Sequence, residues 1–140
     1  MTTEAQGVYL DASALVKLVI REAETAELRR YLAPGPPLYS SRIAAVEVRR
    51  AVARQGQRHA DEQVEQLLAT LRFVELDDDL ARAASAAQPS TLRTLDAIHL
   101  ASALAIADGL QAVVVYDARL AEAVRRAGLV VTTPGRSSPS

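Results

Sequence analysis

The sequence predicts an α/β domain with a mainly parallel central sheet, and three observations support this prediction. Short β-type runs alternate with helical stretches along the chain, as in strands joined by helical crossovers. The run Val113–Val115 is continuously apolar, which is typical of a strand buried on both faces. The 140 residues contain no internal repeat or linker, so we expect one domain over residues 1–133 and a disordered tail over 134–140.

Helices are predicted where apolar residues recur at spacings of three and four. In chain order these stretches are residues 13–20, 24–32, 43–55, 61–71, 77–87, 95–108 and 119–127. Proline or glycine follows most of them, and Ser40 or Ser41, Asp77 and Thr94 are suitable N-caps. Strands are predicted for the short apolar runs between the helices, residues 8–10, 38–40, 73–76, 112–116 and 129–132.

Composition and charge narrow the class of protein. The chain is 49% hydrophobic with a formal net charge of −1, which suits a globular domain. It contains no cysteine, which excludes a disulfide framework and a thiolate metal site. No apolar run is long enough to span a membrane and no signal peptide is evident, so we expect a cytoplasmic protein without membrane contact. Lys17 is the only lysine, so any contact with a polyanion would depend on a local patch of arginine.

Two aspartates stand at the ends of predicted strands. Asp11 directly follows the strand over residues 8–10, and Asp117 directly follows the strand over residues 112–116. In an open parallel sheet, ligands bind beyond the carboxyl ends of the strands, so both carboxylates would lie on one rim. The alternative, still open at this point, is that each aspartate only caps a helix or forms a turn.

Two further carboxylates occur on helices with apolar surroundings. Glu47 lies on or beside the apolar face of its helix, where a buried carboxylate needs a partner or a metal. It could instead be a boundary residue that pairs with Arg50 or Arg54. Asp96 lies in the first turn of its helix, where the helix dipole alone would favour it, but that turn has little polar face.

These four carboxylates, Asp11, Glu47, Asp96 and Asp117, occur where the fold could bring them together. Their mutual repulsion would then raise the pKa of each, and a divalent cation would remove that cost. Oxygen ligands without a cluster of cysteine or histidine favour Mg²⁺ or Mn²⁺ over zinc. The sequence therefore predicts an acidic site for magnesium or manganese.

Four segments resemble a known family when they are taken in this order and spacing. They are VYLDASALVKL, SSRIAAVEVRRAV, LDAIHLASALAIADG and VVVYDARLAEAVRRAGLVV. They resemble the PIN-domain ribonucleases, specifically the VapC toxins of prokaryotic toxin–antitoxin pairs, over roughly residues 8–132. The acidic residues of that family fall on the same four carboxylates, and its hydroxyl near the first aspartate falls on Ser13.

The resemblance implies a three-layer α/β/α sandwich and an endoribonuclease that depends on Mg²⁺ or Mn²⁺. It also implies an RNA substrate, with tRNA and rRNA as candidates, a small antitoxin as inhibitor, and a homodimer. In this interpretation Asp11 and Asp96 are primary metal ligands, and Asp117 binds the metal directly or through water. Glu47 would orient the attacking water or complete a second metal position. Ser13 would hydrogen-bond a ligand carboxylate, serve as an ordinary N-cap, or do both.

Two other polar features have simpler interpretations. His99, one turn after Asp96, is more readily a packing residue than a general base, and the other histidine, His59, lies in a polar stretch. Residues 77–79 more readily cap a helix than bind a metal.

The arginines suggest two places for RNA contact. One set is either a phosphate-binding stripe or a solvated helix face: Arg49, Arg50, Arg54 and Arg58. Arg119 follows Asp117 closely and is the better candidate for a contact with an RNA phosphate.

Other functions compete with a nuclease. A receiver-like regulatory domain also gathers aspartates at strand ends, but it needs adjacent acidic residues at the first strand and a lysine after the last. A phosphatase with an aspartate nucleophile usually needs a second aspartate two residues on, where this chain has Ser13. A third candidate is a catalytically inactive PIN-like module that binds metal or RNA as a regulator, and the complete set of acidic residues argues against it.

Overall fold

A five-stranded, all-parallel sheet forms the centre of the computed structural model, which describes residues 6–33, 35–56 and 60–136. The strand order is β3-β2-β1-β4-β5. The strands are β1 (Gly7–Leu10), β2 (Leu38–Ser41), β3 (Arg72–Val74), β4 (Leu110–Val114) and β5 (Val131–Thr132). Every neighbouring pair is parallel, so the predicted parallel sheet is confirmed.

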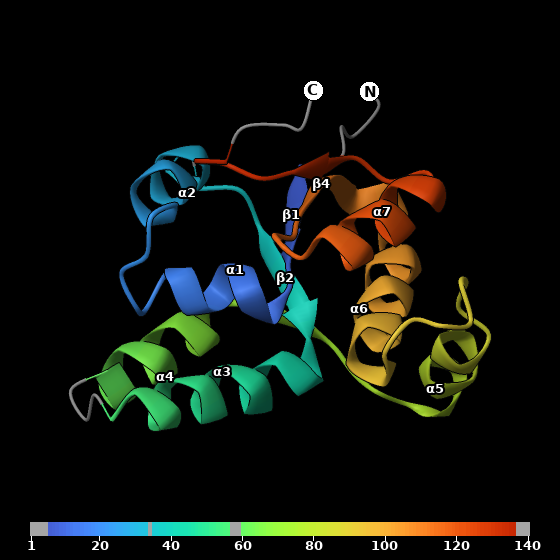
Figure 1. The fold of residues 1–140 in the computed structure, drawn as a ribbon, viewed down its shortest axis with the longest axis horizontal. Helices are drawn as coiled ribbons and strands as arrows, with labels where there is room; N and C mark the ends of the chain where they lie inside the picture. The colour runs from blue at the N-terminus through green and yellow to red at the C-terminus, as the bar shows by residue number, and fades with distance from the viewer. Residues whose placement is uncertain (1–5, 34, 57–59, 137–140) are drawn as a thin grey trace.

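Helices cover both faces of this sheet (Figure 1). One face packs against α1 (Ala12–Lys17), α2 (Thr25–Leu32), α3 (Arg42–Gln55) and α4 (Ala60–Thr70). The other face packs against α5 (Asp78–Ser85), α6 (Thr94–Ala105) and α7 (Ala118–Arg126), with a short 3₁₀ turn, η1 (Ala107–Gly109), after α6. The expected three-layer α/β/α sandwich is therefore confirmed.

Strand β1 contributes to both layers of core because its side chains alternate. Val8 and Leu10 point into the core beneath α1 and α3, whereas Tyr9 points to the opposite core beneath α6 and α7. All four residues of the strand are buried, as a central parallel strand requires. Tyr9 thus brings a hydroxyl group into the layer that carries α6.

The residues that cap two of the helices agree only in part with the prediction. Ser41 rather than Ser40 caps α3, since its Oγ accepts a hydrogen bond from the Ile43 amide, while the Ser40 hydroxyl donates to the Leu10 carbonyl. The expected cap at Thr94 is wrong, because Arg93 occupies the N-cap of α6 without a side-chain hydrogen bond. Gly56 ends α3 in the left-handed conformation, φ 67°, as predicted.

Two helices are shorter than the periodicity predicts. Helix α1 ends at Lys17 instead of residue 20. The amides of Leu18 and Val19 donate to the carbonyls three residues earlier, in the tighter 3₁₀ pattern, rather than four residues earlier. Helix α6 ends at Ala105 instead of residue 108, because Ile106 leaves the helical region with φ −121°. No helix in the described ranges has the length and hydropathy that crossing a bilayer requires.

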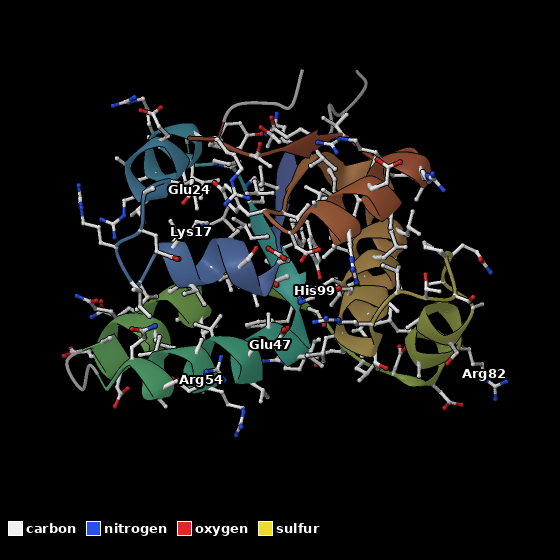
Figure 2. The ribbon with its side chains drawn as sticks, in the orientation of Figure 1. Lys17, Glu24, Glu47, Arg54, Arg82 and His99 are labelled. Atoms are coloured by element: carbon white, nitrogen blue, oxygen red, sulfur yellow. The ribbon has the colours of Figure 1, made fainter. Side chains whose placement is uncertain are left out.

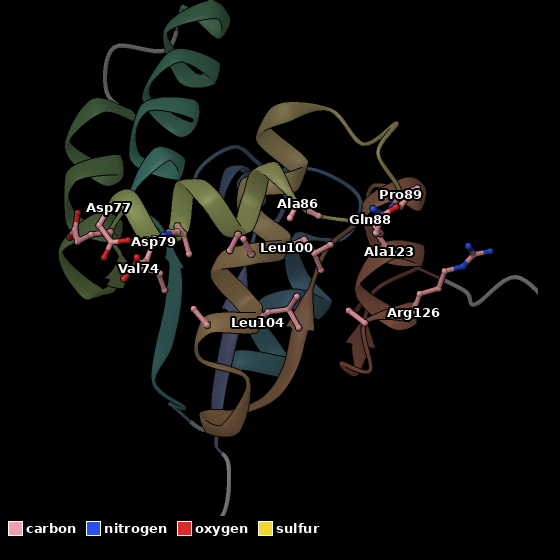
Figure 3. A pocket seen from close by; sticks show the side chains of 17 residues that line it. Val74, Asp77, Asp79, Ala86, Gln88, Pro89, Leu100, Leu104, Ala123 and Arg126 are labelled. Atoms are coloured by element: carbon pink, nitrogen blue, oxygen red, sulfur yellow. Dashed lines mark hydrogen bonds between the residues drawn. The ribbon is translucent and has the colours of Figure 1, made fainter.

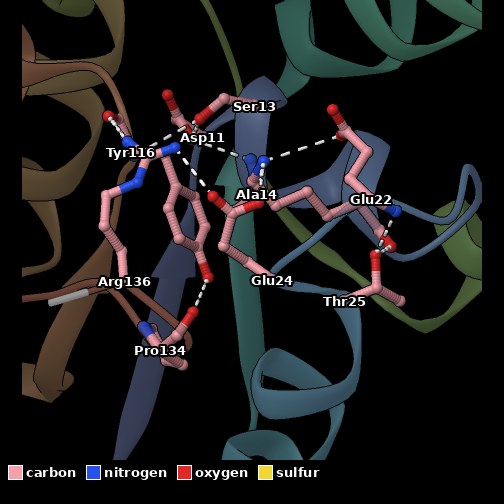
Figure 4. Close-up of polar contacts among 10 residues, drawn as sticks. Asp11, Ser13, Ala14, Glu22, Glu24, Thr25, Tyr116, Pro134 and Arg136 are labelled. Carbon is pink, nitrogen blue, oxygen red and sulfur yellow. Dashed lines mark hydrogen bonds and ion pairs between the residues drawn. The ribbon is translucent and has the colours of Figure 1, made fainter.

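A polar network fastens the C-terminal segment to α1 and α2 (Figure 4). Arg136 donates to Glu24 at 2.8 Å and to the Tyr116 carbonyl at 2.7 Å. Lys17 donates to the other Glu24 oxygen at 3.1 Å, and the Tyr116 hydroxyl donates to the Pro134 carbonyl at 2.8 Å. These contacts involve residues 134–136 of the stretch 134–140, for which the sequence predicts disorder; residues 137–140 lie outside the described ranges.

We predict that Glu24→Gln lowers the free energy of unfolding at neutral pH by about 2–4 kcal/mol, because it removes the anion between two cations. The hydrogen bonds from Arg136 and Lys17 lower the pKa of Glu24 from its ordinary 4.5 to about 2. The Glu24 carboxylate therefore contributes its full stabilisation of the folded state at pH values above its unfolded-state pKa. This contribution is lost as the pH falls toward 2.

Denaturant unfolding of wild type and variant across this acidic range tests the prediction. The difference in stability should shrink as the pH falls. The control is Glu27→Gln, on the same helix, whose exposed pair with Arg30 contributes little. A difference that stays constant with pH would contradict the assigned role of the carboxylate charge.

Candidate active site

Asp11 lies at the carboxyl end of the central strand and is 5% exposed. Its Oδ1 caps α1 by accepting from the Ala14 amide at 3.1 Å, and it also accepts from the Ser13 hydroxyl at 2.6 Å. Burial raises the pKa of the Asp11 carboxyl, and these hydrogen bonds act in the opposite direction. A bound cation would offset the cost of burying the charge of this carboxylate.

Ser13 links Asp11 to the neighbouring strand. Its Oγ donates to Asp11 and accepts from the Tyr116 amide at 3.4 Å, just beyond the end of β4 (Figure 4). The structure makes Asp11 the N-cap of α1, so Ser13 is not the cap. The hydrogen bond from this hydroxyl to a site carboxylate, which the resemblance implied, is present.

Glu47 reaches the same edge from α3 and pairs with a histidine rather than with Arg50 or Arg54. Its Oε1 lies 2.8 Å from Nε2 of His99, on α6 (Figure 2). The His99 ring is 3% exposed, and its Nδ1 lies 2.7 Å from the Tyr9 hydroxyl. His99 is thus a buried residue with both ring nitrogens bonded, and it fixes the orientation of Glu47.

The tautomer of this histidine follows from its two partners. Burial raises the pKa of Tyr9, so its hydroxyl keeps the proton, and it donates to Nδ1 whenever the ring is neutral. Nε2 then carries the ring proton and donates to the Glu47 carboxylate. Sequence reasoning identified His99 as a packing residue; its pairing with Glu47 was not anticipated.

Asp96 and Asp117 lie at the starts of α6 and α7. Together with Asp11 and Glu47 they form the group of four carboxylates that we call the acidic edge. Asp96 is half-buried in the first turn of α6. Burial raises the pKa of its carboxyl, and the charges of Asp117 and Glu47 raise it further. Asp117 is exposed and caps α7, since its Oδ1 accepts from the Leu120 amide at 2.9 Å. Both readings of Asp117, cap and site residue, are therefore compatible with its position.

The donor chemistry of this edge fits an oxygen-preferring divalent ion, since the groups are carboxylates that repel one another. The carboxyl of Asp11 is disfavoured as an anion by Glu47, and that of Asp96 by Asp117 and Glu47. In the described residues, however, no three acidic or histidine side chains are close enough together to hold one ion. Binding an ion would require the carboxylates to move toward a common point.

A large pocket of the described residues lies elsewhere. It has a volume of about 870 Å³ between α5, α6 and α7, and small apolar side chains make up much of its wall (Figure 3). None of the four carboxylates lines it. Because its wall is mostly apolar and its charged members are three acidic side chains and the single arginine Arg126, we place the candidate active site at the acidic edge.

Other predicted residues keep structural roles. Asp77 caps α5 through a 2.8 Å bond from the Leu80 amide, with Asp78 and Asp79 in the first turn, as expected. Arg49 is bound bidentately by Glu65, which weakens the case for a free phosphate stripe on α3. Arg58 and His59 lie outside the described residues.

Carboxylates along the carboxyl edge of a parallel sheet, between two helical layers, define an α/β domain with a candidate acidic site. The model of the PIN domain family matches residues 8–126. The chain therefore belongs to the PIN domain family.

Within that family its relatives are VapC proteins. The chain is 42% identical to Ribonuclease VapC47 of Mycobacterium tuberculosis, over 91% of this chain and 97% of that protein. Two solved structures share the fold. Mycobacterium tuberculosis VapC20, described as a Sarcin-Ricin loop cleaving toxin, has a TM-score of 0.71 at 19% identity, covering 91% of this chain and 99% of its own. A toxin–antitoxin complex from Klebsiella pneumoniae has 0.67 at 24%, covering 91% and 97%.

We predict that Tyr9→Phe leaves Nδ1 of His99 without its donor and lowers the free energy of unfolding by about 1–2 kcal/mol. In the wild type at mildly alkaline pH, ¹⁵N NMR of the imidazole should show the Nε2–H tautomer, and the variant should show a mixture. Tyr31→Phe is the control, because its hydroxyl makes no hydrogen bond in the described residues. An Nδ1–H tautomer in the wild type would overturn the assigned direction of this hydrogen-bond chain.

Proposed function

We propose that this chain is an endoribonuclease that hydrolyses RNA phosphodiester bonds and depends on Mg²⁺ or Mn²⁺. The observation that carries the proposal is the acidic edge, where the buried Asp11 and the half-buried Asp96 have raised pKa values and share Glu47 as an acidic neighbour. The 42% identity to a protein named as a ribonuclease supports the reaction class.

In this proposal some residues of the acidic edge would bind the metal ion, and others would hold those ligands or contact the RNA. Asp11 and Asp96 would hold the ion, Asp117 would bind it directly or through water, and Ser13 would keep the Asp11 carboxylate in place. When bound, a divalent ion lowers the pKa of its water and offsets the charge of the phosphate. Arg119, exposed in the first turn of α7, would contact an RNA phosphate.

Glu47 would orient the attacking water and accept its proton, or complete a second metal position. A carboxylate suits this work only if it stays ionised and correctly turned. The hydrogen bond with His99 Nε2 and the buried Tyr9–His99 pair restrict where the carboxylate can point. His99 is therefore a positioning residue in this proposal.

Partners follow from the relatives. The Klebsiella pneumoniae neighbour is a toxin–antitoxin complex, and this supports a small cognate antitoxin as the inhibitor of this chain. A homodimer, a cytoplasmic location, and tRNA or rRNA as substrate belong to the same proposal.

One observation favours a second candidate function. The carboxylates of the described residues do not gather three ligands around one point. A catalytically inactive PIN-like module that binds metal or RNA as a regulator needs no such gathering. The cleavage assay below distinguishes the two functions.

We predict that Asp96→Asn abolishes RNA cleavage and leaves the fold intact. The change keeps the size of the side chain and removes one anionic ligand, so cleavage should fall by about a hundredfold or more. The measurement is cleavage of total cellular RNA by purified protein with Mg²⁺ or Mn²⁺, with EDTA as the metal-free reference.

The matched control is Asp108→Asn, an exposed aspartate in η1 away from the acidic edge. Discrete fragments that need metal, persist in the control and vanish in Asp96→Asn would support the endoribonuclease. Cleavage that is equal in wild type and Asp96→Asn would sink the assignment, and absence of cleavage would favour the regulatory module.

We also predict that Mn²⁺ raises the melting temperature of the wild type and that this gain is lost as the pH falls. Because the pKa values of Asp11 and Asp96 are raised, protons compete with the ion at a higher pH than for ordinary aspartates. Without metal, Asp96→Asn should be at least as stable as the wild type at neutral pH, since it removes a disfavoured charge. Thermal melts with and without Mn²⁺ between mildly acidic and neutral pH test this; an Mn²⁺ gain that persists in Asp96→Asn would contradict it.

A further inference from the structure

A second hollow adjoins the acidic edge between the starts of α6 and α7. Its volume is about 620 Å³, and Asp96 forms part of its wall. Three arginines also line it: Arg93 before α6, and Arg119 and Arg126 on α7. A ligand bound at the acidic edge could therefore extend into a hollow that is lined by arginines.

The arginines of this hollow are available for a ligand. Arg93 and Arg119 are exposed and make no ion pair within the described ranges. Arg126 is paired only with Glu122 on its own helix, at 3.0 Å, and both side chains are more than half exposed. Such an exposed pair contributes little, so Arg126 can exchange its partner for a phosphate at small cost.

The opposite flank of the acidic edge differs. On α3, Arg42 and Arg49 are each bound by a glutamate, Glu75 at 2.6 Å and Glu65 at 2.8 Å. Beside Glu47, α3 exposes Val46, which is 56% exposed and offers no charge. The arginines gathered around a hollow thus lie on the α6–α7 side, where Arg126 alone has a partner, on its own helix.

The charge of Arg93 also acts on the site itself. It lies close enough to Asp96 to lower the pKa of that carboxyl, against the effect of burial. Arginine suits a phosphate because its planar guanidinium donates two parallel hydrogen bonds, which a lysine cannot do. The wall includes Glu122 and Asp96 as its acidic members, so three cations face two anions.

We propose that this hollow binds the phosphate backbone of the RNA strand on one side of the scissile bond, with Arg93, Arg119 and Arg126 as the phosphate contacts. The position of the scissile phosphate at the acidic edge rests on the proposed function; the hollow extends that site in one direction only. Contacts to phosphates carry no base sequence, so the hollow supplies affinity and register rather than the choice of cleavage site.

Equilibrium binding without metal tests this proposal. The probe is a fluorescein-labelled single-stranded RNA of about twelve nucleotides, followed by anisotropy in EDTA at several salt concentrations. Arg93→Gln, Arg119→Gln and Arg126→Gln should each weaken binding about 5- to 20-fold and lower the slope of log K against log salt by about 1.

The matched control is Arg125→Gln, which makes the same change of charge at an exposed position on the same helix outside the hollow. It should bind like the wild type. Equal binding by all four variants, an equal loss in the control, or no binding by the wild type would each overturn the proposal. Because the assay needs no cleavage, a wild type that binds through the hollow and never cuts RNA would refute the endoribonuclease alone.

Discussion

Helix N-termini stabilise the negative charge that the acidic edge gathers, and the rest of the site depends on this. The Asp11 carboxylate accepts from the first turn of α1, and that of Asp117 accepts from the first turn of α7. Asp96 lies in the first turn of α6, where the helix dipole favours an anion. In a parallel α/β domain each strand leads into a helix at the same edge, so this topology supplies several such termini together.

The same bonds explain how these carboxylates serve both structure and chemistry. The caps of Asp11 and Asp117 are both made through Oδ1, and no hydrogen bond involves their Oδ2 in the described residues. Glu47 is different because it lies inside α3 rather than at the start of a helix, and a side chain holds it instead of a backbone amide. His99 fills that role from the opposite helical layer, and Tyr9 of the central strand holds His99 in turn.

The sequence was sufficient for the sheet and for the edge at which the carboxylates meet. Alternation of strand and helix predicts parallel pairing, and parallel pairing puts Asp11 and Asp117 at one rim. The bond between Glu47 and His99 could not be predicted, since its partners are 52 residues apart and meet only when both helical layers pack. The available signal was a histidine on a helix without a polar face, which requires buried partners.

The contacts of the C-terminal segment could not be predicted for a related reason. Its proline, serine and glycine content predicts disorder, but Arg136 finds Glu24, 112 residues earlier, beside the only lysine of the chain. Composition indicates whether a segment tends to be disordered in isolation. It does not indicate whether an arginine in that segment will pair with an acidic residue far away in the sequence. The ends of α1 and α6 were misplaced because local periodicity continues past the residue where the backbone turns.

The hollow lined by Arg93, Arg119 and Arg126 compensates for the negative charge of the acidic edge. A net charge of −1 gives the whole molecule no attraction for RNA, and carboxylates at the edge repel a phosphate. Cations adjacent to that edge, Arg93 nearest among them, offset the repulsion for the flanking phosphates, while a divalent ion would offset it for the central one. Each kind of cation then lowers the cost of bringing RNA to the carboxylates. In the proposed function, metal binding and RNA binding are therefore coupled, each strengthening the other by the same factor.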